Sequence, residues 1–227
     1  MGTPAAAPRL VELRVADEPE AWRAAGFAVD GDVVELGGVG IRLVGRPDDE
    51  PTGIVGWTLS DVAVDDGDLD GLPTEVVAPP GGEGDRGDGG RPAHPNGCIG
   101  LDHVVVFTPD LDRTLATLDA AGLDLRRIRD TTSHGSPMRQ AFFRLGPVIL
   151  EVVGGDTGTG LPAADAPATW FGLAVDVADL DETAEVLGEA LGPIKGAVQE
   201  GRRIATLRHR DLGVSVAIAA MDDHAAR

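Results

Sequence analysis

The stretch Gly100-Leu-Asp-His-Val-Val-Val-Phe-Thr-Pro-Asp-Leu-Asp112 decides the fold, because its pattern returns 69 residues later along the chain. The apolar runs at 101–106 and 170–175 are typical of strands, and each is followed by an Asp-Leu-Asp start of a helix. Self-similarity at a fixed spacing indicates duplicated structural units. The sequence therefore predicts that the C-terminal half is a tandem repeat.

Each copy predicts the order β-α-β-β-β. In the first copy, Thr108 and Pro109 have the form of an N-cap and first helical residue, and the leucines at 111, 115 and 118 recur at helical spacing before Gly122. In the second copy a matching apolar face runs from Leu180 and ends at Gly192-Pro193. Short apolar runs after the helices predict strands at 123–128, 138–145 and 147–153, then at 194–198, 203–208 and 214–220.

The N-terminal half is a fainter version of the same plan. It predicts a strand at 10–15, a helix at 18–25 and strands at 33–36 and 39–44. A further strand at 53–61 is followed only by residues 68–72, which could form a helical turn before a proline, so this module is expected to be truncated. We expect degenerate N-terminal modules at 9–77, a Gly/Pro-rich linker at 78–97 and a paired-module domain at 98–221.

The net charge and the cysteine content limit the classes of partner and the cellular compartment that we expect. The 227-residue chain has a net charge of −19, which disfavours nucleic acid and anionic membranes because few cations are present to neutralise phosphates. Cys98 is the sole cysteine, so an intramolecular disulfide is excluded. The first residues have no signal-peptide pattern, and no run of about 18 apolar residues occurs. We therefore predict a cytoplasmic protein with a small-molecule partner.

A tandem of such modules, with His103 in the first strand and Glu151 in the last, resembles the vicinal oxygen chelate superfamily: glyoxalases, bleomycin-resistance proteins and extradiol dioxygenases. Residues 100–112 and 139–153 are the stretches most similar to the glyoxalase-like branch. The resemblance implies an α+β fold in which paired βαβββ modules curl into a half-open barrel. It also implies a divalent cation held by ligands from the first and last strands.

Carried over by position, His103 and Glu151 match the ligands of this resemblance. The second module departs from it, since Gly172 stands where the second histidine is expected and Ala217 or Ile218 where a carboxylate is expected. A catalytic zinc normally takes three protein ligands, and His209 is the candidate for a third. The resemblance thus leaves two alternatives, a divalent metal (zinc, nickel, iron or manganese) or none.

The candidate residues also have ordinary interpretations. A histidine on a strand is often satisfied by a neighbouring carbonyl, whereas Glu151 on an apolar strand must reach solvent, a donor or a cation. Period-two alternation places Gln140 and Arg144 on one face and Arg139 on the other. Gln140, together with His134 in the loop at 131–137, is a candidate substrate contact.

An acidic turn at Asp66-Gly-Asp-Leu-Asp-Gly71 matches the start of a calcium-binding EF-hand loop. The match fails afterwards, because Val77 stands where the bidentate glutamate belongs and Pro73 obstructs a following helix. We interpret this segment as an acidic surface turn.

Two functions follow from these observations. The first is a small-molecule enzyme of isomerase or lyase type, with Glu151 as a catalytic carboxylate and His103 and Glu151 as ligands of an incomplete divalent-metal site. The alternative is a metal-free protein that binds or sequesters a small ligand, as in the bleomycin-resistance branch. The weak N-terminal modules could instead serve only in packing or in a homodimer.

Overall fold

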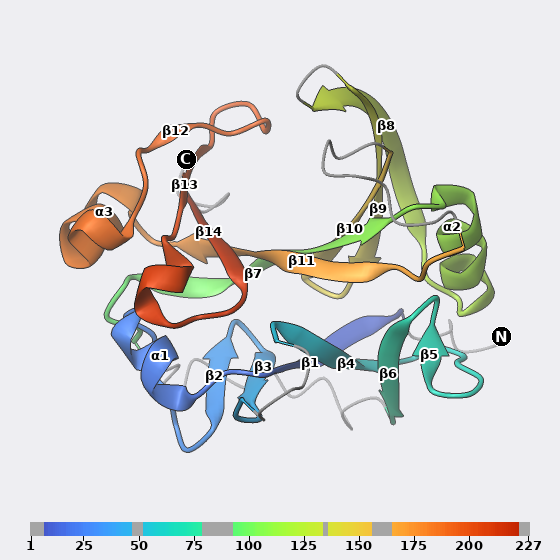
Figure 1. The fold of residues 1–227 in the computed structure, drawn as a ribbon, viewed down its shortest axis with the longest axis horizontal. Helices are drawn as coiled ribbons and strands as arrows, with labels where there is room; N and C mark the ends of the chain where they lie inside the picture. Colours follow the sequence, from blue (N-terminus) through green and yellow to red (C-terminus); the bar gives the residue numbers. More distant parts are fainter. Residues whose placement is uncertain (1–6, 47–51, 79–92, 134–135, 156–164, 223–227) are drawn as a thin grey trace, which may run out of the picture. The chain divides into compact units, whose positions relative to one another are not determined.

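The computed structural model describes residues 7–46, 52–78, 93–133, 136–155 and 165–222 (Figure 1). As predicted, the fold is α+β, with strands in two mixed sheets and few helices. The chain divides into two compact units. Unit 1 comprises Met1–Val11, Gly56–Gly82 and His103–Phe171, and unit 2 comprises Glu12–Val55, Glu83–Asp102 and Gly172–Arg227. Of the expected linker, residues 79–92 lie outside the described residues.

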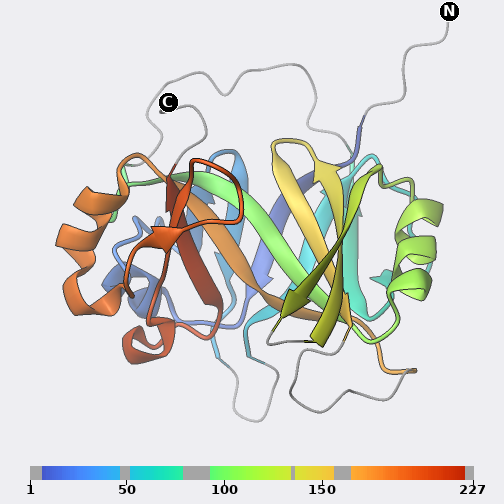
Figure 2. The same cartoon turned by 90° about the horizontal axis from the view of Figure 1, so that it is seen from above.

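Unit 1 carries two of the repeated modules. The strands of the longer module pair in the order β7-β10-β9-β8, with β7 parallel to β10 and the other pairs antiparallel. Figure 2 shows β8 and β9 side by side, with α2 beyond them. The elements are β4 (Ile54–Ser60), β5 (Asp68–Leu69), β6 (Leu72–Val77), β7 (Cys98–Thr108), α2 (Leu111–Ala120), β8 (Leu125–Ser133), β9 (Ser136–Leu145) and β10 (Val148–Gly155).

Helix α2 begins later than predicted. Asp110, not Thr108, is the N-cap, and its side chain accepts a hydrogen bond from the Arg113 amide at 3.0 Å. Thr108 ends strand β7, and its hydroxyl accepts from the Asp110 amide at 3.1 Å. The Asp carboxylate takes the capping role because it satisfies an amide of the first turn and carries negative charge at the helix N-terminus.

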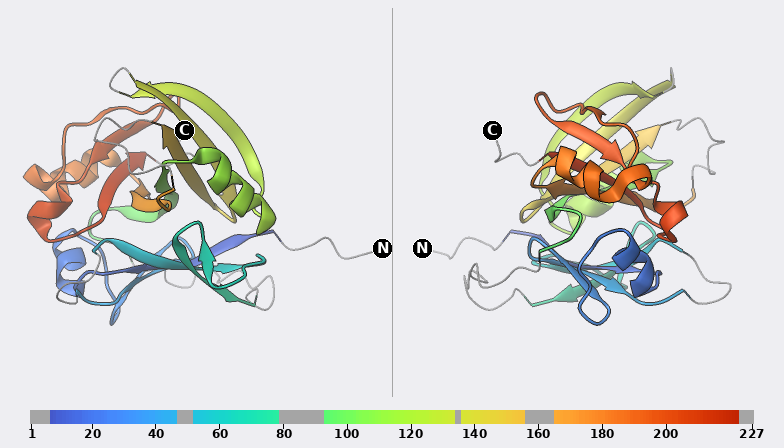
Figure 3. Two further views of the ribbon diagram at one scale, coloured as in Figure 1. Left: turned by 45° about the vertical axis from the view of Figure 1, so that its right-hand side comes forward. Right: turned by 90° about the vertical axis from the view of Figure 1, so that its left-hand side faces the viewer.

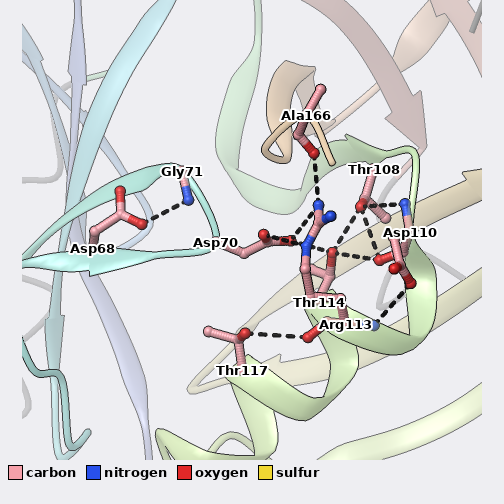
Figure 4. A network of polar contacts seen from close by, with 9 residues as sticks. All are labelled: Asp68, Asp70, Gly71, Thr108, Asp110, Arg113, Thr114, Thr117 and Ala166. Atoms are coloured by element: carbon pink, nitrogen blue, oxygen red, sulfur yellow. Dashed lines mark hydrogen bonds and ion pairs between the residues drawn. The ribbon is translucent and has the colours of Figure 1, made fainter. Parts of the chain in front are cut away.

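The acidic turn is tied to helix α2 (Figure 4). The helical turn expected at 68–72 is wrong, because Asp68 and Leu69 pair antiparallel with β6. Asp70 adopts a positive φ of 53°, and its carboxylate accepts from Arg113 Nε at 2.8 Å and from the Thr114 hydroxyl. Arg113 and Thr114 of α2 therefore satisfy the carboxylate of Asp70. These contacts account for an aspartate at this position of the turn without a metal ion.

Unit 2 carries the other two modules. Strand β11 lies parallel to β14, and the outer pairs β13–β14 and β12–β13 are antiparallel. Figure 3 shows α3 close to β13, and the ion pair between Arg203 and Asp181 joins them at 2.9 Å. The elements are β1 (Arg9–Val15), α1 (Pro19–Ala24), β2 (Val33–Leu36), β3 (Val39–Leu43), β11 (Thr169–Val177), α3 (Leu180–Leu187), β12 (Lys195–Gly196), β13 (Arg203–Thr206) and β14 (Ala217–Asp222).

Helix α3 ends earlier than predicted. It stops at Leu187 because Gly188 takes a φ of 53°, a conformation that breaks the helix and starts a short 3-10 turn. A second 3-10 helix, His209–Leu212, stands between β13 and β14. Strand β14 consequently begins at Ala217, three residues later than the sequence indicated.

The repeat is visible in the strand pairing. In each of the four modules the first strand lies parallel to the last, as β1–β3, β4–β6, β7–β10 and β11–β14. The β4–β6 module has no helix among its described residues, in agreement with the predicted truncation. None of the helices in the described ranges is long and apolar enough to span a membrane.

Candidate functional site

One face of the β7-β10-β9-β8 sheet is only partly covered. Residues that pair across neighbouring strands point to the same face, so the register defines what this face carries. The opposite face is core, with Val104, Phe143 and Leu150 fully buried. We call the partly covered surface the site face. Three sets of residues that pair across neighbouring strands lie on it: Arg127, Phe142, Glu151 and Val105; Arg129, Gln140, Val153 and Phe107; and Arg144, Ile149 and His103.

Four side chains on the site face form a continuous polar row, consisting of Arg129, Gln140, Glu151 and His103. Arg129 Nε donates to Gln140 Oε1 at 2.9 Å, and Gln140 Nε2 donates to Glu151 Oε1. The other carboxylate oxygen, Oε2, lies 3.8 Å from His103 Nε2. These contacts fix the orientation of the Gln140 amide, with its oxygen toward the cation and its nitrogen toward the carboxylate.

The polar row compensates the burial of a carboxylate. The side chains of Glu151 and His103 are 14% and 18% exposed, so both lie mostly out of solvent. An ionised carboxylate in such a place needs hydrogen-bond donors, and the Gln140 amide supplies one. A shift of under about 1 Å would bring His103 into hydrogen-bonding distance of Glu151, and catalytic contacts are often this loose before a ligand binds.

Aromatic rings flank the polar row. Phe142 lies under two guanidinium groups, with Arg127 Cζ at 5.1 Å and Arg129 Cζ at 5.9 Å from the ring centroid. On the other side, Phe107 packs against Phe171 with ring centroids 4.5 Å apart, and Phe171 is 51% exposed. The site face thus offers apolar surface on both sides of a charged centre, the composition typical of small-molecule sites.

The corresponding positions of the β11–β14 module carry no ligating side chain. His103 pairs with Ile149 and Gly172 with Ala217, so the register makes Ala219 the counterpart of Glu151. The sequence had indicated Ala217 or Ile218, and the later start of β14 explains the difference. A Cβ at Gly172 would overlap the Ala217 carbonyl oxygen and approach its Cβ to 3.0 Å, so the backbone leaves no room for a histidine.

The remaining predicted site residues have different surroundings. Gln140 joins the polar row, whereas His209 belongs to unit 2 and its Nδ1 lies 2.9 Å from the Val214 carbonyl oxygen. His209 lies in a 3-10 helix rather than at the end of a strand. His134 lies outside the described residues.

Burial raises the pKa of the Cys98 thiol to about 12, which keeps it protonated and unsuited to bind a cation.

The donor set is too small for the divalent metal that the resemblance implies. In the part of the chain that the structure describes, no group of three or more His, Cys, Asp or Glu side chains could hold an ion. His103 and Glu151 offer two donors, and the oxygen of Gln140 faces Arg129. These residues do not fit a centre of three protein ligands. His103 and Glu151 alone would hold a cation only weakly.

The comparison with solved structures decides the fold family. A mutant of 4-hydroxymandelate synthase from Streptomyces coelicolor matches with a TM-score of 0.66 and 16% identity, covering 99% of this chain and 94% of that one. The chain has the vicinal oxygen chelate fold. An extradiol ring-cleaving dioxygenase from B. fuscum also matches (TM-score 0.55, 16% identity, 99% of this chain and 75% of that one).

A third structure that matches over nearly the whole chain is a xylose isomerase-like TIM barrel/4-hydroxyphenylpyruvate dioxygenase fusion protein. Its TM-score is 0.62 at 13% identity, covering 99% of this chain and 51% of that one. No family model and no curated protein matches the sequence. At these identities the likeness establishes the fold, and the chemistry must be argued from the site face.

Sequence reasoning did not identify the two arginines of strand β8 that lie over Phe142. The predicted strand ended at residue 128, and β8 continues to Ser133, so Arg129 fell outside it. The alternation of Arg127 and Arg129 was the available signal, because residues two apart on a strand share a face. Which face they share depends on the pairing of β8 with β9, and that is a tertiary property.

Proposed function

We propose that this vicinal oxygen chelate fold serves a small-molecule enzyme of isomerase or lyase type, in which Glu151 is the base and His103 the neighbouring acid. One observation carries the proposal: the polar row holds a carboxylate and an imidazole 3.8 Å apart on a partly covered face. A mostly buried carboxylate beside a titratable group is the arrangement that proton transfer requires. Small molecules with a C–H next to a carbonyl are the substrates that such a pair can process.

Each group has a defined part in the proposed reaction. Ionised Glu151 takes the proton from the carbon next to the carbonyl, the electron pair of the broken C–H bond forms a C=C double bond, and the π electrons of the carbonyl move to its oxygen. Protonated His103 donates its proton to that oxygen, which gives the neutral enol. Gln140 holds the carboxylate in position through its amide hydrogen bond. General acid–base catalysis of this kind contributes about 10²- to 10⁴-fold in rate.

Proton exchange tests this proposal without knowledge of the natural substrate. The protein is incubated in D2O with 2-oxobutanoate and with acetoin, two compounds with adjacent oxygens, and loss of the C–H signals is followed by proton NMR. We expect Glu151→Gln to slow the exchange at least about 100-fold. The control Glu75→Gln, which removes an exposed glutamate of β6, should exchange like the unaltered protein. Equal rates in the Glu151→Gln variant and the unaltered protein would overturn the proposal.

Elemental analysis addresses the metal. Protein purified without chelator or affinity tag is compared with the His103→Ala variant. We expect no stoichiometric transition metal in either, because the described donors do not form a three-ligand centre. A near-stoichiometric metal that is lost in the variant would replace the metal-free mechanism with a metal-assisted one.

A metal-free binding protein is the second candidate. The observation that favours it is the β11–β14 module, where Gly172 and Ala219 stand at the positions of His103 and Glu151. Calorimetry separates the two functions. Binding of a compound to both the unaltered protein and Glu151→Gln, with no exchange in either, would establish the binding function.

A further inference from the structure

Arg127 and Arg129 form a pair on one face of the edge strand β8. Both guanidinium groups lie over the ring of Phe142, with guanidinium carbons 5.1 and 5.9 Å from its centroid. Arg127 is exposed and Arg129 is partly buried. The aromatic ring fixes the stems and heads of both side chains, so their planar donors are presented in a limited range of orientations.

These two arginines differ from most of the other arginines in the described ranges. Within the described ranges, neither Arg127 nor Arg129 has an ion pair with a carboxylate. In contrast, a carboxylate lies within 4.0 Å of each arginine of a larger group, namely Arg23, Arg42, Arg46, Arg113, Arg126, Arg139, Arg202 and Arg203. In a chain with a net charge of −19, two adjacent cations without a carboxylate partner mark a local site for an anion.

The polar row limits the length of a ligand that contacts both Arg129 and Glu151. Gln140 lies between Arg129 and Glu151 and forms a hydrogen bond with each. The width of its amide group and the two hydrogen bonds together separate the guanidinium from the carboxylate by about 8 Å. A ligand must leave one hydrogen-bond length to the guanidinium and about 3 Å to the carboxylate. About 2 Å then remain between its charged oxygen and its acidic carbon, which is roughly the distance across two bonds, so the ligand is a small molecule.

We propose that the ligand is a small organic carboxylate and that Arg127 and Arg129 bind its charged group while the acidic C–H faces Glu151. This inference rests on the proposed function, since it names the substrate class of the same site. A guanidinium presents parallel N–H donors that match the two oxygens of a carboxylate. Because Gln140 already engages Arg129, Arg127 supplies the larger share of the free donors.

Binding calorimetry with a matched pair of compounds tests the proposal. The probes are 2-oxobutanoate and its neutral methyl ester. We expect the unaltered protein to bind the acid at least about 10-fold more tightly than the ester, and Arg127→Gln to remove that preference. Arg127→Lys, which keeps the charge but not the fork, should restore part of it. Arg126→Gln is the control, because Arg126 is exposed, lies next in sequence and pairs with Asp124 at 2.7 Å.

The outcomes separate this inference from the proposed function. Preference for the acid that is lost in Arg127→Gln and kept in Glu151→Gln supports the anion site, whether or not Glu151 is needed for proton exchange. Inorganic phosphate as a competitor distinguishes a carboxylate site from a general anion site: failure to displace the acid at equal concentration is the expected result. Equal affinity for acid and ester, no binding of either, or an equal loss in Arg126→Gln would overturn the proposal.

Discussion

The β7–β10 and β11–β14 modules have the same strand pairing but carry different side chains at equivalent positions. In both, the first strand is parallel to the last, and the same register relates His103 to Ile149 and Gly172 to Ala217. The first module carries the polar row on its site face. The second carries a glycine and an alanine at the positions of His103 and Glu151, so the two copies share the scaffold while the first alone carries this pair.

The charges of the two modules also differ in how they are satisfied. In the β11–β14 module, Arg202 is 3% exposed and donates to Asp102 at 2.7 Å, to Asp176 and to the Asp222 carbonyl. A buried cation held by two carboxylates is a structural element, since most of its N–H donors are used inside the fold. The arginines of β8 are instead turned toward Phe142, which leaves their charge available to a ligand.

Adding a side chain at Gly172 should have the largest effect on the stability of the β11–β14 module. Gly172→Ala places a Cβ against the Ala217 carbonyl, so strands β11 and β14 must separate or bend. We expect a loss of about 3 kcal/mol in the free energy of unfolding, measured by urea titration. Gly196→Ala is the control, because a Cβ there meets no atom within 4 Å. Equal stability of the two variants would show that the close approach of β11 and β14 is unimportant.

The ends of the last strands offer a second, smaller test. Strand β10 ends near Gly154, whose missing Cβ leaves room for Leu111, whereas β14 ends at Asp222, which pairs with Arg203 at 2.8 Å. The hydrogen bond and charge of Arg203 lower the pKa of Asp222 below its ordinary value. Asp222→Asn should lower the melting temperature by about 2 °C at pH 7, a modest value because Arg203 is partly exposed.

The pH dependence of that difference follows from the direction of the shift. A carboxyl with a lowered pKa in the folded state stabilises the protein above its ordinary pKa near 4, and the stabilisation is lost as the pH falls through the folded value. The melting temperatures of Asp222→Asn and the unaltered protein should therefore converge as the pH falls below the ordinary carboxyl pKa. Asp181→Asn, which removes the exposed partner of Arg203, should have a smaller effect. A constant difference across the pH range would contradict the ion-pair explanation.

Adding a carboxylate to the second module should have the smallest effect. Ala219 is partly exposed, so the side chain of Ala219→Glu can reach solvent, and we expect a change of under about 0.5 kcal/mol by urea titration. The variant should also fail to restore proton exchange when combined with Glu151→Gln, because Gly172 supplies no imidazole. A loss as large as that of Gly172→Ala would mean that both positions of this module are closed to side chains.

The sequence was informative where the signal is local. The spacing of 69 residues predicted the repeat, and strand alternation placed Gln140 and Arg144 on one face, as the register confirms. It was less accurate where two local signals compete, as at the start of α2, where Asp110 caps more effectively than Thr108. It could not align Ala219 with Glu151, because the 3-10 helix before β14 absorbs residues that local periodicity assigns to a strand.

By itself, the sequence predicted most of the strands and helices and the duplicated plan, and it identified His103, Glu151 and Gln140 as candidate site residues, because periodicity and residue type are properties of short segments. The tertiary structure alone decided which side chains meet. Pairing of β8, β9, β10 and β7 brings Arg129, Gln140, Glu151 and His103 into one row. Close contact of β11 with β14 excludes a side chain at Gly172. Which strands become neighbours, and how closely their backbones approach, depends on segments that lie far apart in the sequence, so a local pattern does not determine it.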